Sequence, residues 1–222
     1  MISKSSVITT LFIDLDDTLY PASSGVWSLI RQRIDRYMVE RLNYPPDQVA
    51  AIRASLFQTY GTTMRGLQAI HQIDEADFLA FVHDVPVHEH LTPDRRLREV
   101  LSAYPQQKII LTNADTRHAQ RVIQALELEN LFQQIIDIRA IAPFCKPQEG
   151  AFTTALRLAH ESDPAYCLVI DDAPRNLLAA RQLGFHVALV AEPPVRPEPG
   201  FPAITRLSDL PAIFPCDHLE RP

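Results

Sequence analysis

Polar side chains that could perform acid–base or phosphate chemistry follow three short apolar runs of this sequence, each at the point where the run ends. They are Asp14, Asp16, Thr112, Asn113, Asp171 and Asp172, and the runs cover 7–13, 108–111 and 167–170. Short apolar, β-branched runs are typical of buried strands, and ligands bind at the edge of a parallel sheet where the carboxyl ends of its strands meet. The sequence therefore predicts that three distant segments converge on one small volume.

The carboxylates in that volume would repel one another, and burying them without partners would be costly. A hard divalent cation resolves the repulsion, because Mg²⁺ prefers oxygen ligands and keeps water positions that a substrate phosphate can take. Lys146 could keep Asp14 ionised and contact a phosphate oxygen, while Thr112 and Asn113 could donate hydrogen bonds to it. This set predicts a phosphoryl-transfer site, since the transferring group needs positive partners held in place.

The elements that position these residues follow two patterns along the chain. After residue 90, helical and strand-like segments alternate, which indicates a parallel sheet covered on both faces. The expected strands are 7–13, 108–111, 134–138, 167–170 and 185–190, and the expected helices are 93–103, one around 119–126, one opened by Pro147, one at 174–184 and a short one at 208–214. The proline-rich segment 192–202 is expected to run over the surface.

Residues 22–90, by contrast, show only helical periodicity. Helices are expected at 28–42, after Asp47, at 63–71 and after an N-cap at Asp74. One strand is not stable alone, so the first strand must belong to the later sheet and the helical block must be an insert. We predict a doubly wound α/β core made of 1–21 and 91–222, with an α-helical cap at 22–90.

Composition excludes several classes of protein. The 222 residues carry 21 Lys and Arg against 27 Asp and Glu, with no basic block, so a nucleic-acid polymer is not an expected partner. Neither G-x-G-x-x-G nor a P-loop occurs among the 6 glycines. Three scattered cysteines form no zinc or disulfide pattern, and the first apolar run is too short for a signal peptide or membrane span. We expect a cytoplasmic protein without membrane contact.

The ordered residues resemble the four motifs of the haloacid dehalogenase-like hydrolases: Asp14-x-Asp16-x-Thr18, then Thr112, Lys146 and the Asp171–Asp172 pair. The place of the helical insert, between the first and second motifs, is similar to the C1 cap of that superfamily. Three stretches also resemble its pyrimidine 5′-nucleotidase subgroup: DLDDTLYP at 14–21, YGTTMRGL at 60–67 and LTNA at 111–114.

The resemblance implies a role for each motif. Asp14 would be the nucleophile that forms an aspartyl-phosphate, and Asp16 would protonate the leaving oxygen and then deprotonate the attacking water. The Asp14 carboxylate and the Asp16 backbone carbonyl would bind Mg²⁺, while Thr112 and Lys146 would grip the phosphate. In the fourth motif we expect Asp172 to be the direct ligand, with Asp171 behind it. Many relatives carry a second acid where this chain has Asn176, which could still hold a metal-bound water.

Other residues allow a functional and a structural interpretation. Arg65 has no obvious acidic partner nearby and could bind the substrate, or it could be a surface arginine. The aromatics Trp27, Tyr20 and Phe57 could stack on a base, although such residues usually form a cap core. For Cys145 we favour a buried filler over a reactive thiol, and for the histidines at 83–90 a solvated linker over a metal cluster.

The resemblance implies Mg²⁺-dependent hydrolysis of a small phosphorylated metabolite, with a pyrimidine nucleoside monophosphate favoured. Phosphoglycolate, a sugar phosphate and pyridoxal phosphate remain alternatives, as does a phosphomutase, which needs the same aspartates. A dehalogenase is disfavoured, because it has no use for Asp16 as an acid. An inactive ligand-binding domain is also disfavoured, because it need not keep both Asp14 and Asp16. We expect a monomer or a small homo-oligomer.

Overall fold

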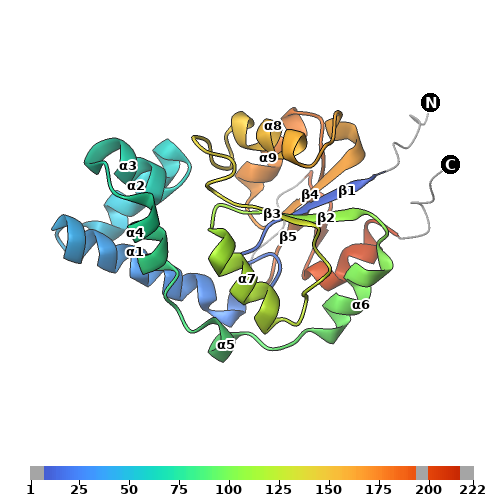
Figure 1. The fold of residues 1–222 in the computed structure, drawn as a ribbon, viewed down its shortest axis with the longest axis horizontal. Helices are drawn as coiled ribbons and strands as arrows, with labels where there is room; N and C mark the ends of the chain where they lie inside the picture. The colour runs from blue at the N-terminus through green and yellow to red at the C-terminus, as the bar shows by residue number, and fades with distance from the viewer. Residues whose placement is uncertain (1–7, 194–199, 216–222) are drawn as a thin grey trace.

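The computed structural model describes residues 8–193 and 200–215, and its centre is one parallel sheet (Figure 1). The strands are β1 (Thr10–Ile13), β2 (Gln107–Leu111), β3 (Gln134–Ile136), β4 (Cys167–Asp171), β5 (His186–Val190) and β6 (Ala203–Ile204). Their order is β3-β2-β1-β4-β5-β6, and every neighbouring pair is parallel. The predicted doubly wound α/β fold is confirmed, and β1 lies between the two other strands that carry motif residues.

The register of these three strands determines which residues reach the edge of the sheet. Ile13 is aligned with Ile110 on one side and with Ile170 on the other. Asp14 and Asp171 each lie one residue beyond these partners, so both emerge at the same carboxyl edge. Side chains alternate between the faces of a strand, which brings the residues that follow β1, β2 and β4 together.

Helices cover both faces of the sheet. In Figure 1, α8 (Glu149–Leu158) and α9 (Pro174–Gln182) lie on one side, and α6 (Arg95–Ala103) and α7 (Thr116–Ala125) lie on the other. The apolar residues of β1 divide accordingly, because Phe12 packs with the α8 and α9 face while Leu11 and Ile13 pack with the opposite face. Two apolar layers of this kind explain why the strands read as continuous hydrophobic runs.

The block between β1 and β2 contains helices and no strand over 22–90, as predicted. It comprises a 3₁₀ helix η1 (Ala22–Ser24), then α1 (Val26–Leu42), α2 (Val49–Tyr60), α3 (Thr63–His71), α4 (Glu75–Val82) and α5 (Val87–His90). The helices α1 to α4 pack together at one end of the sheet (Figure 1). The Asp74 side chain caps α4 by accepting from the Asp77 N–H at 2.7 Å, which confirms that N-cap.

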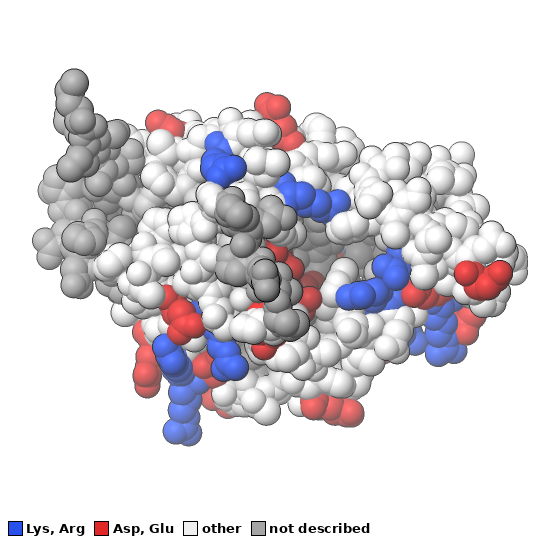
Figure 2. Space-filling model, turned by 180° about the vertical axis from the view of Figure 1, so that it is seen from behind, with Lys and Arg blue, Asp and Glu red and all other residues white. Residues whose placement is uncertain are grey.

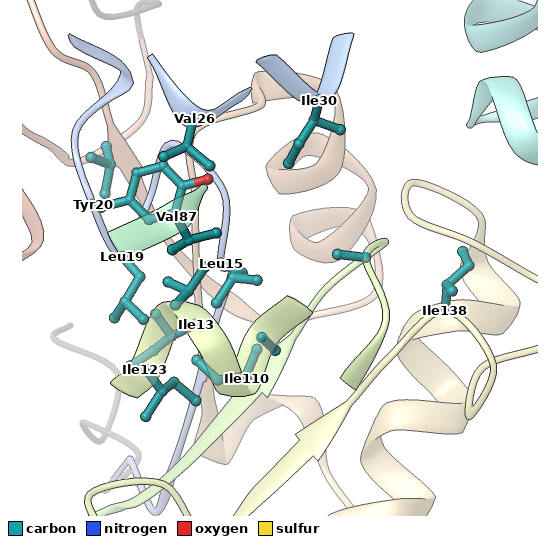
Figure 3. Packing of buried hydrophobic residues seen from close by; sticks show 14 of the residues in the cluster. Ile13, Leu15, Leu19, Tyr20, Val26, Ile30, Val87, Ile110, Ile123 and Ile138 are labelled. Atoms are coloured by element: carbon teal, nitrogen blue, oxygen red, sulfur yellow. The ribbon is translucent and has the colours of Figure 1, made fainter. Parts of the chain in front are cut away.

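The loop that follows β1 is fixed by apolar packing. Leu15, Leu19 and Tyr20 are buried, and Figure 3 shows them beside Val26 and Val87. These last two residues come from the first and last parts of the helical insert. The two places where the chain passes between core and insert therefore both pack against the segment that carries Asp14 and Asp16.

Several element boundaries differ from the sequence prediction. The third strand ends at Ile136, because the Asp137 carboxylate accepts N–H bonds from Thr116, Arg139 and Ala140 and turns the chain. The helix expected at Pro147 begins at Glu149, after a turn closed by bonds between Gln148 and Cys145.

The structure also differs from the prediction near the end of the described chain. The short final helix is a 3₁₀ helix, η3 (Leu207–Ala212), and β6 was not predicted. Residue 7 of the first expected strand and 194–199 of the proline-rich segment lie outside the described residues.

Candidate active site

Three carboxylates meet at the carboxyl edge of β1 and β4. Asp14, Asp171 and Asp172 can each offer one oxygen such that these atoms lie within 4.8 Å of one another. Asp171 is fully buried, whereas Asp14 and Asp172 are partly exposed and line a cavity. Such close like charges are stable only with cationic partners.

Lys146 supplies one such cation. Its Nζ donates to Oδ1 of Asp14 and to Oδ2 of Asp171, each at 2.7 Å, and the residue is 2% exposed. Burial alone would lower the pKa of Lys146, but the two carboxylates outweigh it and raise that pKa. The ammonium therefore stays charged and clamps the nucleophile candidate to the neighbouring strand.

This one charge does not neutralise the whole cluster. Burial, together with Asp171 and Asp172, raises the pKa of Asp14 well above its ordinary value despite Lys146. Burial and then Asp171 raise the pKa of Asp172 to about 7. A divalent cation would offset both shifts, because it would favour the ionised form of each carboxylate.

The hydrogen bonds show which oxygens are available to such a cation. Asp171 is saturated, since it accepts from Lys146, from the Ala173 N–H at 2.9 Å and from Nδ2 of Asn176 at 3.0 Å. Among the other described side chains, Asp172 contacts the Thr18 hydroxyl at a long 3.5 Å. Oδ1 of Asn176 is buried without a hydrogen bond from any described residue. Free carboxylate oxygens beside an unpaired buried amide oxygen fit hydrated Mg²⁺.

The strand end after β2 contributes Thr112 and Asn113. Thr112 is buried, lines the cavity, and accepts the Ala114 N–H at 2.9 Å through Oγ1, which leaves its own hydroxyl proton available. Asn113 also lines the cavity, but its amide accepts from the Lys146 N–H at 2.9 Å and donates to the Lys146 carbonyl at 3.0 Å. Asn113 thus holds the Lys146 backbone, a role that the sequence did not indicate.

Asp16 has different partners from Asp14. Its Oδ1 accepts from the Tyr20 hydroxyl and lies 2.8 Å from Nε2 of His118 on α7. Burial raises the pKa of Asp16, but His118 and Tyr20 together outweigh this effect and lower it. Sequence reasoning missed His118, although a histidine on the apolar face of α7, next to Ala119, was a usable signal.

The expectation of a solvated linker is wrong for His83. Its ring is buried and stacks on His118, with centroids 4.6 Å apart and planes 10° apart, and its Nδ1 lies 3.1 Å from Oδ1 of Asp115. His83 follows the end of α4 and lies against α7, where Arg121 donates to its carbonyl at 2.7 Å. His88 and His90 are exposed, as expected.

Arg65 is held away from the cavity. Its Nη1 donates to Glu75 and to Gln68, both at 2.8 Å, and its Nη2 donates to the Ile138 carbonyl at 2.9 Å. The expectation that Arg65 lacks an acidic partner is therefore wrong, because α4 folds back beside α3. Arg65 is described in the structure but is not among the residues that line the cavity. Its contacts connect the helical insert to the loop after β3.

A second arginine connects the insert to α9. Arg175 donates to the Gly61 carbonyl at 2.7 Å, and its guanidinium lies 3.5 Å from the centroid of the Phe57 ring. Gly61 has a φ of +86°, and a Cβ there would lie 2.6 Å from Sγ of Cys145. Cys145 is fully buried, which confirms it as a packing residue. The close approach of Cys145 to Gly61 leaves no room for a side chain, which explains why this position is a glycine.

The cavity between the insert and the sheet edge has a volume of about 550 Å³, which is typical of small-molecule sites. Its sheet side carries the motif residues. The insert side has an apolar part formed by Trp27, Ile30, Ile34, Ala54, Phe57, Met64, Phe78, Leu79 and Val82. Its polar side chains are Arg31, Arg53, Gln58, Thr62, Thr63 and His83. Figure 2 shows the hollow, with acidic side chains at its floor and basic ones at its rim. Tyr20, by contrast, is buried behind Asp16.

Residues 8–184 match the haloacid dehalogenase-like hydrolase family. This chain belongs to that family. The hydrolase is also 30% identical over 196 residues to Phosphate metabolism protein 8 from Saccharomyces cerevisiae, an alignment that covers 82% of this chain and 61% of the yeast protein. The chain therefore spans less than two thirds of that relative's length.

Solved structures share the fold of this hydrolase. The magnesium-bound HAD-hydrolase YfnB from Bacillus subtilis has a TM-score of 0.62 at 17% identity, covering 93% of this chain and 98% of its own. An L-2-haloacid dehalogenase from Xanthobacter autotrophicus, with chloropropionic acid covalently bound, has a TM-score of 0.60 at 17% identity with the same coverage. Within the described residues, no helix is long and apolar enough to cross a membrane.

Proposed function

We propose that this hydrolase is a Mg²⁺-dependent phosphomonoesterase that acts through an aspartyl-phosphate on Asp14. The observation that carries the proposal is the arrangement of Asp16, which lines the cavity with Asp14 and has one oxygen without a hydrogen bond from any described residue. A carboxyl group in that position can exchange a proton with a leaving oxygen. Dehalogenation by Asp14 would not need this group.

The reaction has two steps. In the first, Asp16 starts with a proton on Oδ2, the oxygen that accepts no hydrogen bond from a described residue. Asp14 attacks phosphorus, the bond to the leaving oxygen breaks, and that oxygen takes the proton of Asp16. In the second, Asp16 takes a proton from water as the water oxygen attacks phosphorus, which releases phosphate and restores Asp14. Lys146 and Thr112 would stabilise charge on the phosphoryl oxygens in both steps.

Mg²⁺ would be held by Asp14, by the Asp16 carbonyl and by Asp172, with Asn176 bonded to a coordinated water. Its charge would neutralise the phosphoryl group and allow two anions to approach each other. Asp171 would contribute indirectly, because its contacts hold Lys146 and Asn176 in place.

The cavity supports a substrate whose leaving group has a planar ring. Trp27 and Phe57 line its insert side, and aromatic faces suit a planar base. Together with the stretches at 14–21, 60–67 and 111–114, this favours a pyrimidine nucleoside monophosphate over phosphoglycolate, which would leave these surfaces uncovered. The insert 22–90 would then act as a selecting cap on a core of 1–21 and 91–222.

A phosphate-release screen tests the proposal. The intact chain is assayed with Mg²⁺ against UMP, CMP, AMP, phosphoglycolate, pyridoxal phosphate and a sugar phosphate, with chloride release from 2-chloropropionate as the rival reaction. We expect phosphate release, fastest from UMP or CMP, and no chloride. Chloride release without phosphate release would overturn the proposal, and a preference for a smaller ester would overturn only its nucleotide part.

A further inference from the structure

The two oxygens of Asp16 have different surroundings. Oδ1 accepts hydrogen bonds from the Tyr20 hydroxyl and from Nε2 of His118, the second at 2.8 Å. No described residue donates to Oδ2, and the side chain keeps 14% exposure where it lines the cavity. Two donors on a single oxygen fix the rotation of the carboxyl group, so Oδ2 is the oxygen that remains for a ligand.

His118 is itself held firmly. Its side chain is fully buried, its backbone N–H donates to Oδ1 of Asp115 at 2.9 Å, and its ring stacks on His83. Nδ1 of His118 has no hydrogen-bond partner among the described residues. A proton on Nδ1 would be buried without an acceptor, which is costly, so the geometry favours the tautomer in which Nε2–H donates to Asp16.

His118 and Tyr20 reach Asp16 from independent directions. Tyr20 belongs to the same loop after β1, four residues beyond Asp16. His118 belongs to α7, which packs on the sheet and is anchored at its N-cap by Asp115. Of these two donors, only His118 ties the carboxyl group to an element outside its own loop. His118 is not one of the motif residues.

We propose that His118 is the positioning residue that aims Oδ2 of Asp16 at the leaving oxygen; this inference rests on the proposed function. His118 touches neither substrate nor reacting atoms in this arrangement. Its loss would let the Asp16 carboxyl group rotate away from the line of proton transfer, and small misplacements of catalytic groups have large effects on rate. Esters whose leaving oxygen requires a proton would suffer most.

The test compares two esters of similar size. Benzyl phosphate releases an alkoxide that needs a proton, whereas p-nitrophenyl phosphate releases a stable anion that does not. The parameter is kcat/KM, because it includes steps only up to formation of the phosphoenzyme. We expect His118→Leu to lower kcat/KM for benzyl phosphate by about 10- to 100-fold, which is part of the roughly 10²- to 10⁴-fold that general acid catalysis contributes. The change for p-nitrophenyl phosphate should be far smaller.

Two further variants separate positioning from packing. His118→Gln places an amide donor near the Nε2 position and should restore most of the benzyl phosphate activity, whereas His118→Asn is equally polar but too short to reach Asp16 and should not. These two keep the inference testable if the leucine variant unfolds, and urea unfolding checks each variant. His186→Leu makes the same change at the exposed start of β5, far from the site, and should match the unaltered chain.

Each outcome has a definite meaning. Parallel losses for both esters, with no difference between glutamine and asparagine, would overturn the inference and leave the proposed function standing. Unchanged kinetics in His118→Leu would do the same. If the unaltered chain hydrolyses neither ester, the proposed function fails and the inference fails with it.

Discussion

Lys146 and Asp14 form a partly buried ion pair, with Nζ 2.7 Å from Oδ1, although 132 positions separate them in the chain. The same ammonium binds Asp171 on the neighbouring strand. One lysine thus compensates two carboxylates that would otherwise be buried without a counter-charge. This links the stability of the sheet edge to its chemistry, and the link can be measured.

Replacing this lysine should destabilise the fold. Lys146→Met leaves Asp14 and Asp171 without their cation, and breaking a buried pair in this way costs about 3–5 kcal/mol. Urea unfolding in EDTA at neutral pH measures the loss. Adding Asp171→Asn to Lys146→Met should recover part of it, because one uncompensated charge is then removed. A double variant less stable than the sum of the single changes would contradict this view of the pair.

Replacing the nucleophile should abolish turnover without unfolding the chain. Asp14→Asn keeps the shape of the side chain but removes the attacking charge, so kcat should fall by at least about 10³-fold, or about 4 kcal/mol of barrier. The measurement is phosphate release from p-nitrophenyl phosphate with Mg²⁺. Asp47→Asn, at an exposed position, is the matched control and should retain full activity. A tenth of the original rate in Asp14→Asn would rule out the covalent mechanism.

Mg²⁺ should stabilise the protein more at high pH than at low pH. The pKa of Asp172 is raised from 3.8 to about 7 by burial and by Asp171, so between these values the folded chain keeps a proton that the unfolded chain has lost. Without metal, the free energy of unfolding therefore falls as pH rises through this window. Asp14 acts in the same direction. Mg²⁺ takes the place of the protons on Asp14 and Asp172. Its contribution to the free energy of unfolding therefore increases as pH rises and these protons are lost.

Thermal unfolding with and without Mg²⁺ at pH 5 and pH 8 tests this. We expect the metal to raise Tm by several degrees more at pH 8, on the scale of about 2–4 °C per kcal/mol for a chain of this size. Asp172→Asn should flatten the dependence on pH and reduce the Mg²⁺ shift, while Asp47→Asn should change neither. Equal Mg²⁺ shifts at both pH values would show that the carboxylate cluster does not bind the metal in competition with protons.

Arg65 should matter for stability and not for substrate choice. Its charged hydrogen bonds to Glu75, Gln68 and the Ile138 carbonyl are partly buried, so Arg65→Ala should cost about 1–3 kcal/mol in urea unfolding. The ratio of KM values for UMP and p-nitrophenyl phosphate should stay constant. Arg36→Ala, which breaks an exposed pair with Glu40, should cost much less. A selective rise in KM for UMP would instead return Arg65 to a role in binding.

The sequence predicts those parts of the site that depend on strand ends. Asp14, Thr112 and Asp171 follow apolar runs, and a parallel sheet must bring such positions to one edge. The partners of Asp16 and Arg65 could not be predicted, because they depend on how helices pack. His118 reaches Asp16 only because α7 covers the sheet, and Glu75 reaches Arg65 only because α4 folds back beside α3. Periodicity identifies helices but does not specify which ones touch.

The central position of β1 has a consequence for folding during synthesis. Thr10 pairs with Gln107 on one side and with Cys167 on the other. β1 therefore has no neighbour until β2 has been made, and its second side stays unpaired until β4 has been made. Pairing between distant segments is slow, and unpaired strand edges are prone to aggregation. The carboxylates at the ends of β1 and β4 also stay apart until β4 has been made, so the acidic cluster cannot assemble before that point.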